Sequence, residues 1–139
     1  MLISTRGRYA LRVMLELAQY DQGPYMPLPL IAEKQGISEK YLESIVAPLA
    51  KGGLIEGARG KGGGYRLRRP LQDYSAGEIL RLTEGSLAPV SCLEGEENAC
   101  PRAGQCHTLP MWTKLEGLIN NYLDSVTLAD LLDAPLDQV

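Results

Sequence analysis

The sequence predicts a mainly α-helical domain with a small two-stranded β ribbon, followed by a long C-terminal helix. Three observations support this fold class. Apolar residues recur with helical spacing in three segments of the first 51 residues, a glycine-rich turn separates two short strand-like runs near residue 60, and an apolar stripe follows residues 111–123. With 139 residues, 45% of them hydrophobic, the chain is long enough for one domain with its own core.

The first two predicted helices cover residues 5–20 and 30–35. Thr5 is the expected N-cap of the first helix, which has the apolar spacing of a core helix and ends before Gly23-Pro24. Pro29 can open the second helix because the backbone N–H groups of a first turn have no partner within the helix, and Gly36 ends it.

A third helix is expected over residues 39–51, with Ser38 as its N-cap. Its inward face consists of Leu42, Ile45, Val46 and Leu49. Pro48 lies within this helix and is expected to kink its last turn, because proline removes a backbone hydrogen bond. Two short helices joined by a tight turn are typical of a helix-turn-helix, although a helical hairpin in a core has the same pattern.

The segment after the third helix favours the DNA-binding interpretation. Strands are expected over residues 54–56 and 65–67, on either side of a glycine-rich turn that carries Arg59 and Lys61. A flexible basic ribbon of this kind is typical of a wing, whose cations enter a minor groove or lie along phosphate. A nucleotide-binding loop is excluded, because no Gly-Lys pair precedes Ser or Thr and Tyr65 stands where G-x-G-x-x-G needs its last glycine.

The distribution of charge agrees with this interpretation. Residues 1–70 carry 11 Lys and Arg against 6 Asp and Glu, whereas residues 71–139 carry 3 against 11, a division that the net charge of −3 conceals. A basic half is expected of a module that contacts phosphate. Ordinary scatter of surface charge is the alternative explanation.

Further helices are expected after the ribbon. Ser75 and Glu78 have the spacing of a capping box at the start of one, and a longer helix is expected over residues 111–123. The longer helix has a broad apolar stripe made of Trp112, Leu115, Leu118, Ile119 and Tyr122. Burial against a second copy of the chain explains the stripe most simply, and packing back onto the same domain is the alternative. A short helix from Thr127 and a frayed end over residues 134–139 complete the prediction.

The three cysteines and the only histidine lie in one polar loop, with the spacing C-x7-C-x5-C-H from Cys92 to His107. This spacing excludes the C-x2-C pairs of ordinary zinc fingers, and three thiols cannot all close into disulfides. Three thiolates and an imidazole would suit an iron–sulfur cluster or a zinc ion. Thiols that sense by oxidation, without a metal, are the third possibility.

Other functional classes are not expected. No run of 18 or more apolar residues occurs, and the N-terminus lacks the apolar segment of a signal peptide, so we expect a cytoplasmic protein that does not associate with a membrane. With one histidine, no spacing of a catalytic triad and no cofactor fingerprint, the sequence predicts neither an enzyme nor a small-molecule substrate.

Five segments together resemble the Rrf2 family of bacterial winged-helix regulators. They are Ser4-Thr-Arg-Gly-Arg-Tyr-Ala-Leu11, Ile37-Ser-Glu-Lys-Tyr-Leu-Glu43, Arg59-Gly-Lys-Gly-Gly-Gly-Tyr65, the three-cysteine loop, and Asn121-Tyr-Leu-Asp-Ser-Val-Thr-Leu-Ala-Asp130. The resemblance implies a winged helix-turn-helix DNA-binding domain over residues 1–83, a cluster-binding loop over residues 84–109, and a dimerisation helix with a tail over residues 110–139. It also implies a homodimer that controls transcription by binding double-stranded operator DNA.

The resemblance implies a set of DNA-binding residues at the start of the third helix and in the wing. They are Ser38, Glu39, Lys40, Tyr41, Glu43, Ser44, Arg59, Gly60 and Lys61. Glu43 is unusual in this set, because a carboxylate repels phosphate unless it accepts a hydrogen bond from a cytosine amino group. We expect Glu43 to select sequences rather than add affinity, and a solvent-facing charge is the alternative.

Cysteine-bearing members of the family bind an iron–sulfur cluster, and the resemblance implies that this chain does so too, with 2Fe-2S expected over 4Fe-4S and zinc as the alternative. The implied thiol ligands are Cys92, Cys100 and Cys106. The fourth ligand departs from the family patterns, because Leu109 lies three residues after the last cysteine and Arg8 occupies the position of a first-helix carboxylate. The adjacent His107 is the expected fourth ligand, with a glutamate, water or a small thiol as alternatives.

Overall fold

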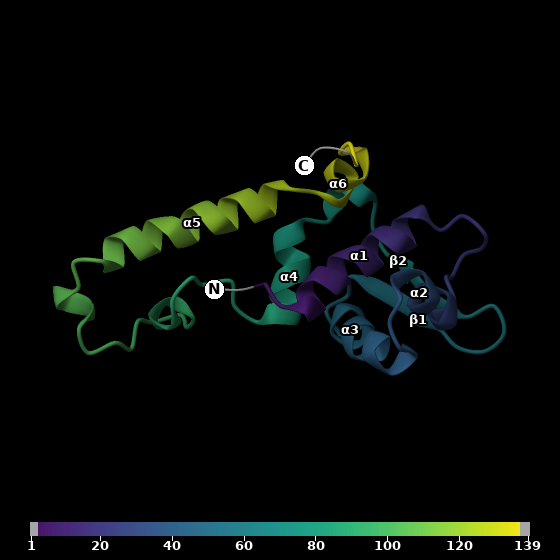
Figure 1. Cartoon of the computed structure of the whole chain (residues 1–139), viewed down its shortest axis with the longest axis horizontal. Helices are drawn as coiled ribbons and strands as arrows, with labels where there is room; N and C mark the ends of the chain where they lie inside the picture. Colours follow the sequence, from purple (N-terminus) through teal and green to yellow (C-terminus); the bar gives the residue numbers. More distant parts are fainter. Residues whose placement is uncertain (1–2, 137–139) are drawn as a thin grey trace.

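The computed structural model describes residues 3–136, which form six α-helices and a two-stranded antiparallel sheet. The elements of the body, residues 3–84, are α1 (Thr5–Gln19), α2 (Leu28–Gln35), α3 (Glu39–Lys51), β1 (Ile55–Ala58), β2 (Gly64–Leu67) and α4 (Ala76–Glu84). Beyond the body lie α5 (Leu109–Ser125) and α6 (Leu128–Asp133). Figure 1 shows the helical body with its ribbon and the long α5 reaching away from it, so the predicted fold class is confirmed.

The core of the body is built from the apolar faces of α1, α3 and α4, which contact one another. Its fully buried side chains include Val13, Met14, Ile31, Leu42, Ile45, Leu49, Leu54 and Ile79. The four residues predicted as the inward face of the third helix are all buried, and Pro48 lies inside that helix as predicted. Burial of these apolar faces is the main favourable term in the folding of the body.

The starts of several helices differ in detail from the prediction. α2 begins at Leu28 rather than residue 30, and α5 at Leu109 rather than residue 111. Ser4, not Thr5, caps α1, and Thr5 is the first helical residue. Ser75 caps α4 by accepting a hydrogen bond from the Glu78 backbone N–H at 3.1 Å. The predicted capping box is wrong in its second half, because the Glu78 carboxylate accepts hydrogen bonds from the Arg69 guanidinium instead of the Ser75 backbone.

A third backbone segment, which was not predicted from the sequence, pairs with the two-stranded ribbon. β1 and β2 pair with Ala58 opposite Gly64, as expected for a wing. Met26, from the segment before α2, adds a β-bridge to Tyr65, with N–H to O distances of 2.9 and 3.0 Å in the two directions. Gly64 has a φ of 143°, and a Cβ at this position would collide with the Met26 carbonyl. Glycine therefore permits the close approach of the two backbones.

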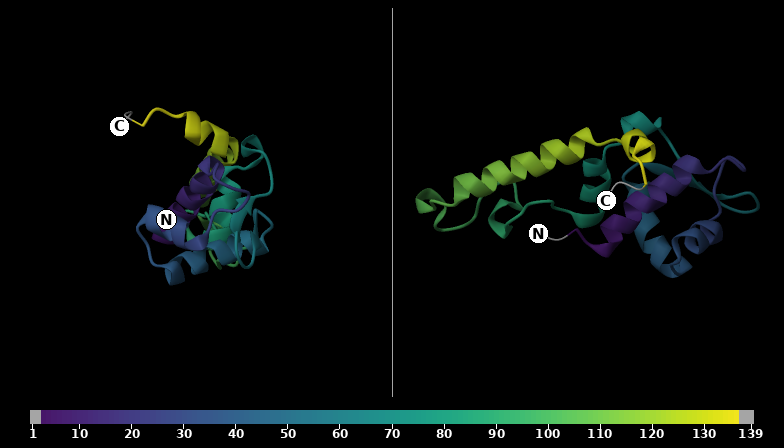
Figure 2. Two further views of the ribbon diagram at one scale, coloured as in Figure 1. Left: turned by 90° about the vertical axis from the view of Figure 1, so that its right-hand side faces the viewer. Right: turned by 45° about the horizontal axis from the view of Figure 1, so that its top comes forward.

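α5 extends away from the body, and none of its 17 residues is buried. The cysteine loop precedes it, so this loop and the wing turn lie at opposite ends of the molecule (Figures 1 and 2). α6 returns to the body, where Leu128 is fully buried. The frayed end expected over residues 134–139 falls partly on residues 137–139, which lie outside the described residues. Within residues 3–136, no helix has the length and apolar character needed to cross a membrane.

Candidate nucleic-acid interface and cysteine loop

The first turn of α3 points its polar residues toward solvent. Ser38 caps the helix, its hydroxyl oxygen accepting from the Tyr41 backbone N–H at 3.1 Å. Glu39 and Lys40 follow it and are exposed. The backbone N–H groups at a helix start carry partial positive charge, and the exposed Lys40 adds a full positive charge beside the negative charge of Glu39.

Tyr41 and Ser44 are half-buried rather than exposed, because their side chains make contacts within the protein. The Tyr41 ring meets the Tyr9 ring of α1 edge to face, with the centroids 5.9 Å apart, and the Arg12 guanidinium lies 4.7 Å from the centroid of Tyr9. The Ser44 hydroxyl donates to the Tyr41 carbonyl at 2.6 Å. The contact between the Tyr41 and Tyr9 rings joins α3 to α1, whereas the Ser44 hydrogen bond lies within α3. A DNA contact by either residue stays a prediction.

The wing turn exposes Arg59, Gly60 and Lys61. Gly60 has a φ of 85°, a left-handed conformation that favours glycine, and its carbonyl accepts from the Gly63 backbone N–H at 3.0 Å to close the turn. Arg59 and the exposed Glu43 of α3 line the same open depression, of about 630 Å³, together with the start of α2. The structure therefore places α3 and the wing on one surface.

The wing is supported by residues that the sequence analysis did not single out. Glu56 and Arg66 are directly opposite each other in the ribbon and form an ion pair. The Arg66 guanidinium also lies 4.7 Å from the centroid of the Tyr25 ring. The strand register would have indicated the Glu56–Arg66 pair, because opposite charges at facing positions stabilise a ribbon. No local pattern indicates the contact with Tyr25.

The cysteine loop carries three free thiols that the structure does not bring together. Cys92 is half-buried and Cys100 is exposed, and both line one open hollow of about 380 Å³. Cys106, also half-buried, lines a separate hollow of about 470 Å³ beside Arg102, and the neighbouring His107 is exposed. In the described part of the chain, no three Cys, His, Asp or Glu side chains lie close enough to hold a metal ion. The ligand set stays a prediction.

The Cys106 thiol lies at the start of α5, where hydrogen bonds favour its charged form. Its Sγ is 3.3 Å from Oγ1 of Thr108, the residue before the first helical residue. The hydrogen bond with the Thr108 hydroxyl, together with those from the backbone N–H groups of Thr108 and Leu109, lowers the pKa of Cys106. The thiolate is the form that binds metals and reacts with electrophiles, so Cys106 is prepared for either chemistry.

Comparison with known proteins identifies what this architecture is similar to. Residues 3–134 match the model of the Rrf2 family, described as an iron-dependent transcriptional regulator. The HTH-type transcriptional regulator CymR of Bacillus subtilis (strain 168) is 41% identical over 132 residues, which cover 94% of this chain and 89% of CymR. The HTH-type transcriptional regulator IscR of Serratia proteamaculans (strain 568) is 35% identical over 133 residues, covering 96% of this chain and 80% of IscR. A crystal structure of Staphylococcus aureus CymR in an oxidized form matches with a TM-score of 0.72 and 36% identity, covering 97% of this chain and 98% of that one.

Proposed function

Because the chain belongs to the Rrf2 family and is a DNA-binding transcriptional regulator, we propose that it binds operator DNA as a homodimer, through the start of α3 and the wing. Lys40, Arg59 and Lys61 would contact phosphate or enter a groove, since all three are exposed on these elements. Glu43 would select sequences from its place on the same depression as Arg59. The proposal keeps the division into residues 1–83, 84–109 and 110–139.

The exposed face of α5 supports the homodimer. Four of its large apolar side chains are exposed, from 37% at Leu115 to 68% at Tyr122, with Met111 and Leu118 between them. Trp112 and Ile119, the other two members of the predicted stripe, are half-buried. An apolar stripe along a whole helix is unfavourable in water, and a second copy of the same helix would cover it. A two-fold dimer presents two copies of α3, which suits a DNA site with two related halves.

The cysteine loop would provide the sensor of this regulator. The observation that carries this proposal is the presence of three free thiols in the segment that joins α4 to α5. Cys92, Cys100, Cys106 and His107 would hold an iron–sulfur cluster, whose loss to oxidants or nitric oxide would report iron–sulfur or stress status. The description of the family as iron-dependent supports this choice.

The cysteine thiols have the right chemistry to bind an iron–sulfur cluster, but the three of them do not lie together in one hollow. Thiolates are the usual ligands of iron–sulfur clusters, and the lowered pKa of Cys106 favours its thiolate. Cys106 would have to approach Cys92 and Cys100, which line a different hollow. Metal binding often orders its own site, so such closure would link cluster occupancy to the position of α5.

Anaerobic purification tests this proposal directly. We expect a coloured protein with iron and sulfide, measured by absorption spectrum and metal assay. Alanine at any of the three cysteines should abolish the colour, whereas Ser91→Ala, a control in the same loop, should retain it. His107→Ala should keep some cluster with an altered spectrum and faster loss in air, and His107→Cys should restore it. Zinc without sulfide would instead identify a zinc-bound repressor.

The Cys106 environment favours a second candidate function, a cluster-free thiol-redox regulator. A half-buried thiol that lines an open hollow and has a lowered pKa reacts readily with oxidants. In this case metal-free protein would change its operator affinity on treatment with peroxide, and Cys106→Ala would remove the change. A metal-free protein whose DNA binding ignores peroxide would contradict this candidate.

A further inference from the structure

We infer that Arg81 positions the body of each subunit relative to α5 and thereby selects the spacing between the two half-sites of the DNA. This inference rests on the proposed homodimer, in which α5 forms the contact between subunits. It assigns to Arg81 a role in specificity although this residue belongs to neither the front of α3 nor the wing.

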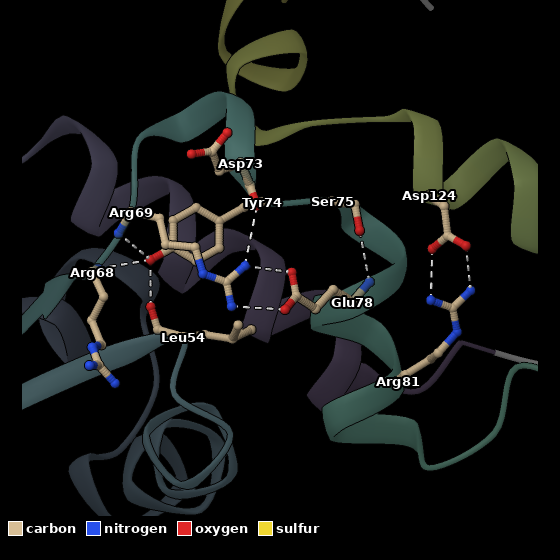
Figure 3. Close-up of polar contacts among 9 residues, drawn as sticks. All are labelled: Leu54, Arg68, Arg69, Asp73, Tyr74, Ser75, Glu78, Arg81 and Asp124. Carbon is tan, nitrogen blue, oxygen red and sulfur yellow. Dashed lines mark hydrogen bonds and ion pairs between the residues drawn. The ribbon is translucent and has the colours of Figure 1, made fainter.

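The contact between α4 and α5 is a directional one (Figure 3). Arg81 Nη1 lies 2.7 Å from Asp124 Oδ1, and Nη2 lies 3.1 Å from Asp124 Oδ2. Nη2 is also 3.0 Å from Asn120 Oδ1, one helical turn earlier on α5. A bidentate pair fixes the plane and direction of both groups, and Asn120 adds a third point. Gly77 of α4 faces Asp124 so closely that a Cβ there would collide with the carboxylate.

The chain just after α5 is also tied to the body, where the Val126 carbonyl accepts from the Ala76 N–H at 2.8 Å and the Leu128 N–H donates to the Tyr74 carbonyl at 3.1 Å. These bonds fix the point at which α5 leaves the body, and the Arg81 contacts lie along α5 itself. α5 contacts the body mainly through α4, and none of its residues is buried. The side chains of Arg81 and Asp124 are 37% and 48% exposed, so their pairing contributes little to stability. The pair instead sets the direction in which α5 leaves the body, because the two residues meet at the end of α5 that is nearest the body.

The other contacts of α4 join it firmly to the DNA-binding surface (Figure 3). Glu78, one turn before Arg81, accepts two hydrogen bonds of 2.9 Å from the Arg69 guanidinium, just after the ribbon. The buried Tyr74 hydroxyl accepts from the Arg69 backbone N–H at 3.0 Å and donates to the Leu54 carbonyl at 2.6 Å. α4 therefore moves together with the wing and α3. The angle between α4 and α5 at Arg81 thus also sets the angle between the DNA-binding surface and α5.

A small change at this joint is enough to alter half-site spacing. α5 has 17 residues and is therefore about 25 Å long. A rotation of about 8° at one end of such a helix displaces the other end by about 3.4 Å, roughly one base-pair step.

Half-site spacing can be measured with DNA that the protein itself selects. Duplexes are selected from a random library by the wild-type dimer, then remade with the central spacer longer or shorter by one or two base pairs. We expect the wild type to prefer one spacing sharply. Arg81→Ala and Gly77→Ala should each reduce that preference, relative to the neighbouring spacings, by about fivefold or more. The exchange of charges in the double variant Arg81→Asp, Asp124→Arg should restore it.

Lys114→Ala is the control. It removes a cation from an exposed position of α5 and touches neither the Arg81 contacts nor the links from α4 to the wing, so the spacing preference should be unchanged. Circular dichroism and sedimentation confirm that each variant is folded and dimeric. If Arg81→Ala and Gly77→Ala retain the sharp preference of the wild type, the inference is wrong while the proposed function stands. A wild type that is monomeric or prefers no spacing would overturn the proposed two-half-site binding, and the inference with it.

Discussion

At the residue scale, Cys106 shows how a helix start changes the chemistry of a thiol. The Thr108 hydroxyl and two backbone N–H groups stabilise the thiolate and lower the pKa of Cys106. Because the thiolate is the reactive form, the reaction rate of a cysteine rises as pH increases through its pKa. For Cys106 this rise is expected at lower pH than for an ordinary cysteine.

Thr108→Val should reverse this effect. Loss of the hydroxyl removes the largest cause of the lowered pKa, so the pH profile of Cys106 alkylation should move to higher pH and the rate at pH 7 should fall. Mass spectrometry of reduced, metal-free protein treated with iodoacetamide would measure the rate at each cysteine. Thr113→Val, at an exposed position of α5, is the control and should leave the profile unchanged. Identical profiles for the two variants would contradict the assignment.

Arg59 tests whether the wing reads a groove. Arg59→Ala should weaken operator binding by about 1–3 kcal/mol, with the loss concentrated on A–T-rich flanks. Arg59→Lys keeps the charge but lacks the planar guanidinium, so it should recover only the part of the affinity that comes from phosphate. Fluorescence anisotropy at fixed salt concentration measures both. Unchanged affinity in Arg59→Ala would place this side chain on the solvated surface.

At the scale of elements, Tyr74 joins the ribbon, the end of α3 and the start of α4. Its side chain is fully buried, and its hydroxyl accepts from the Arg68 and Arg69 backbone N–H groups and donates to the Leu54 carbonyl. Each of these backbone groups comes from a segment that has left regular structure. The hydroxyl therefore supplies hydrogen bonds that the secondary structure does not.

Tyr74→Phe should destabilise the body by about 1–3 kcal/mol, because the Leu54 carbonyl would be left buried without a donor. Guanidinium denaturation followed by circular dichroism measures the change in unfolding free energy. Tyr20→Phe, which removes a hydroxyl from a half-buried ring outside this network, should cost less than about 0.5 kcal/mol. Equal costs for the two variants would show that the Tyr74 network does not stabilise the junction.

At the scale of the whole molecule, the apolar face of α5 is the feature that one chain does not explain. Leu118→Glu places a charge in this face, so we expect dissociation to a folded monomer with weakened operator binding. Sedimentation equilibrium measures the mass, and circular dichroism checks the fold. The body should remain folded because α5 contributes no buried residue to it. Leu136→Glu, at a fully exposed position, is the control. A dimer that persists in Leu118→Glu would refute the proposed interface.

Local patterns in the sequence were enough to predict most elements of the fold. Ser38 begins α3, Gly36 ends α2 in a left-handed conformation, and Thr127 caps α6 in a closed capping box. Each signal acts through residues within one helical turn, so no knowledge of distant contacts is needed. The same holds for the wing turn, whose glycines and cations are consecutive in the sequence.

Contacts between distant segments were decided only by the tertiary structure. Met26 joins the ribbon across 39 positions of the sequence, and Arg81 meets Asp124 across 43. The half-burial of Tyr41 depends on Tyr9 of another helix, which helical periodicity alone does not reveal. Glu78 has the spacing of a capping box, yet its carboxylate pairs with Arg69, because a two-point ion pair with a neighbouring guanidinium is stronger than one hydrogen bond to a backbone N–H. The spacing of residues in the sequence specifies which local contacts are possible. Only the packed chain determines which of these local contacts are replaced by contacts with distant residues.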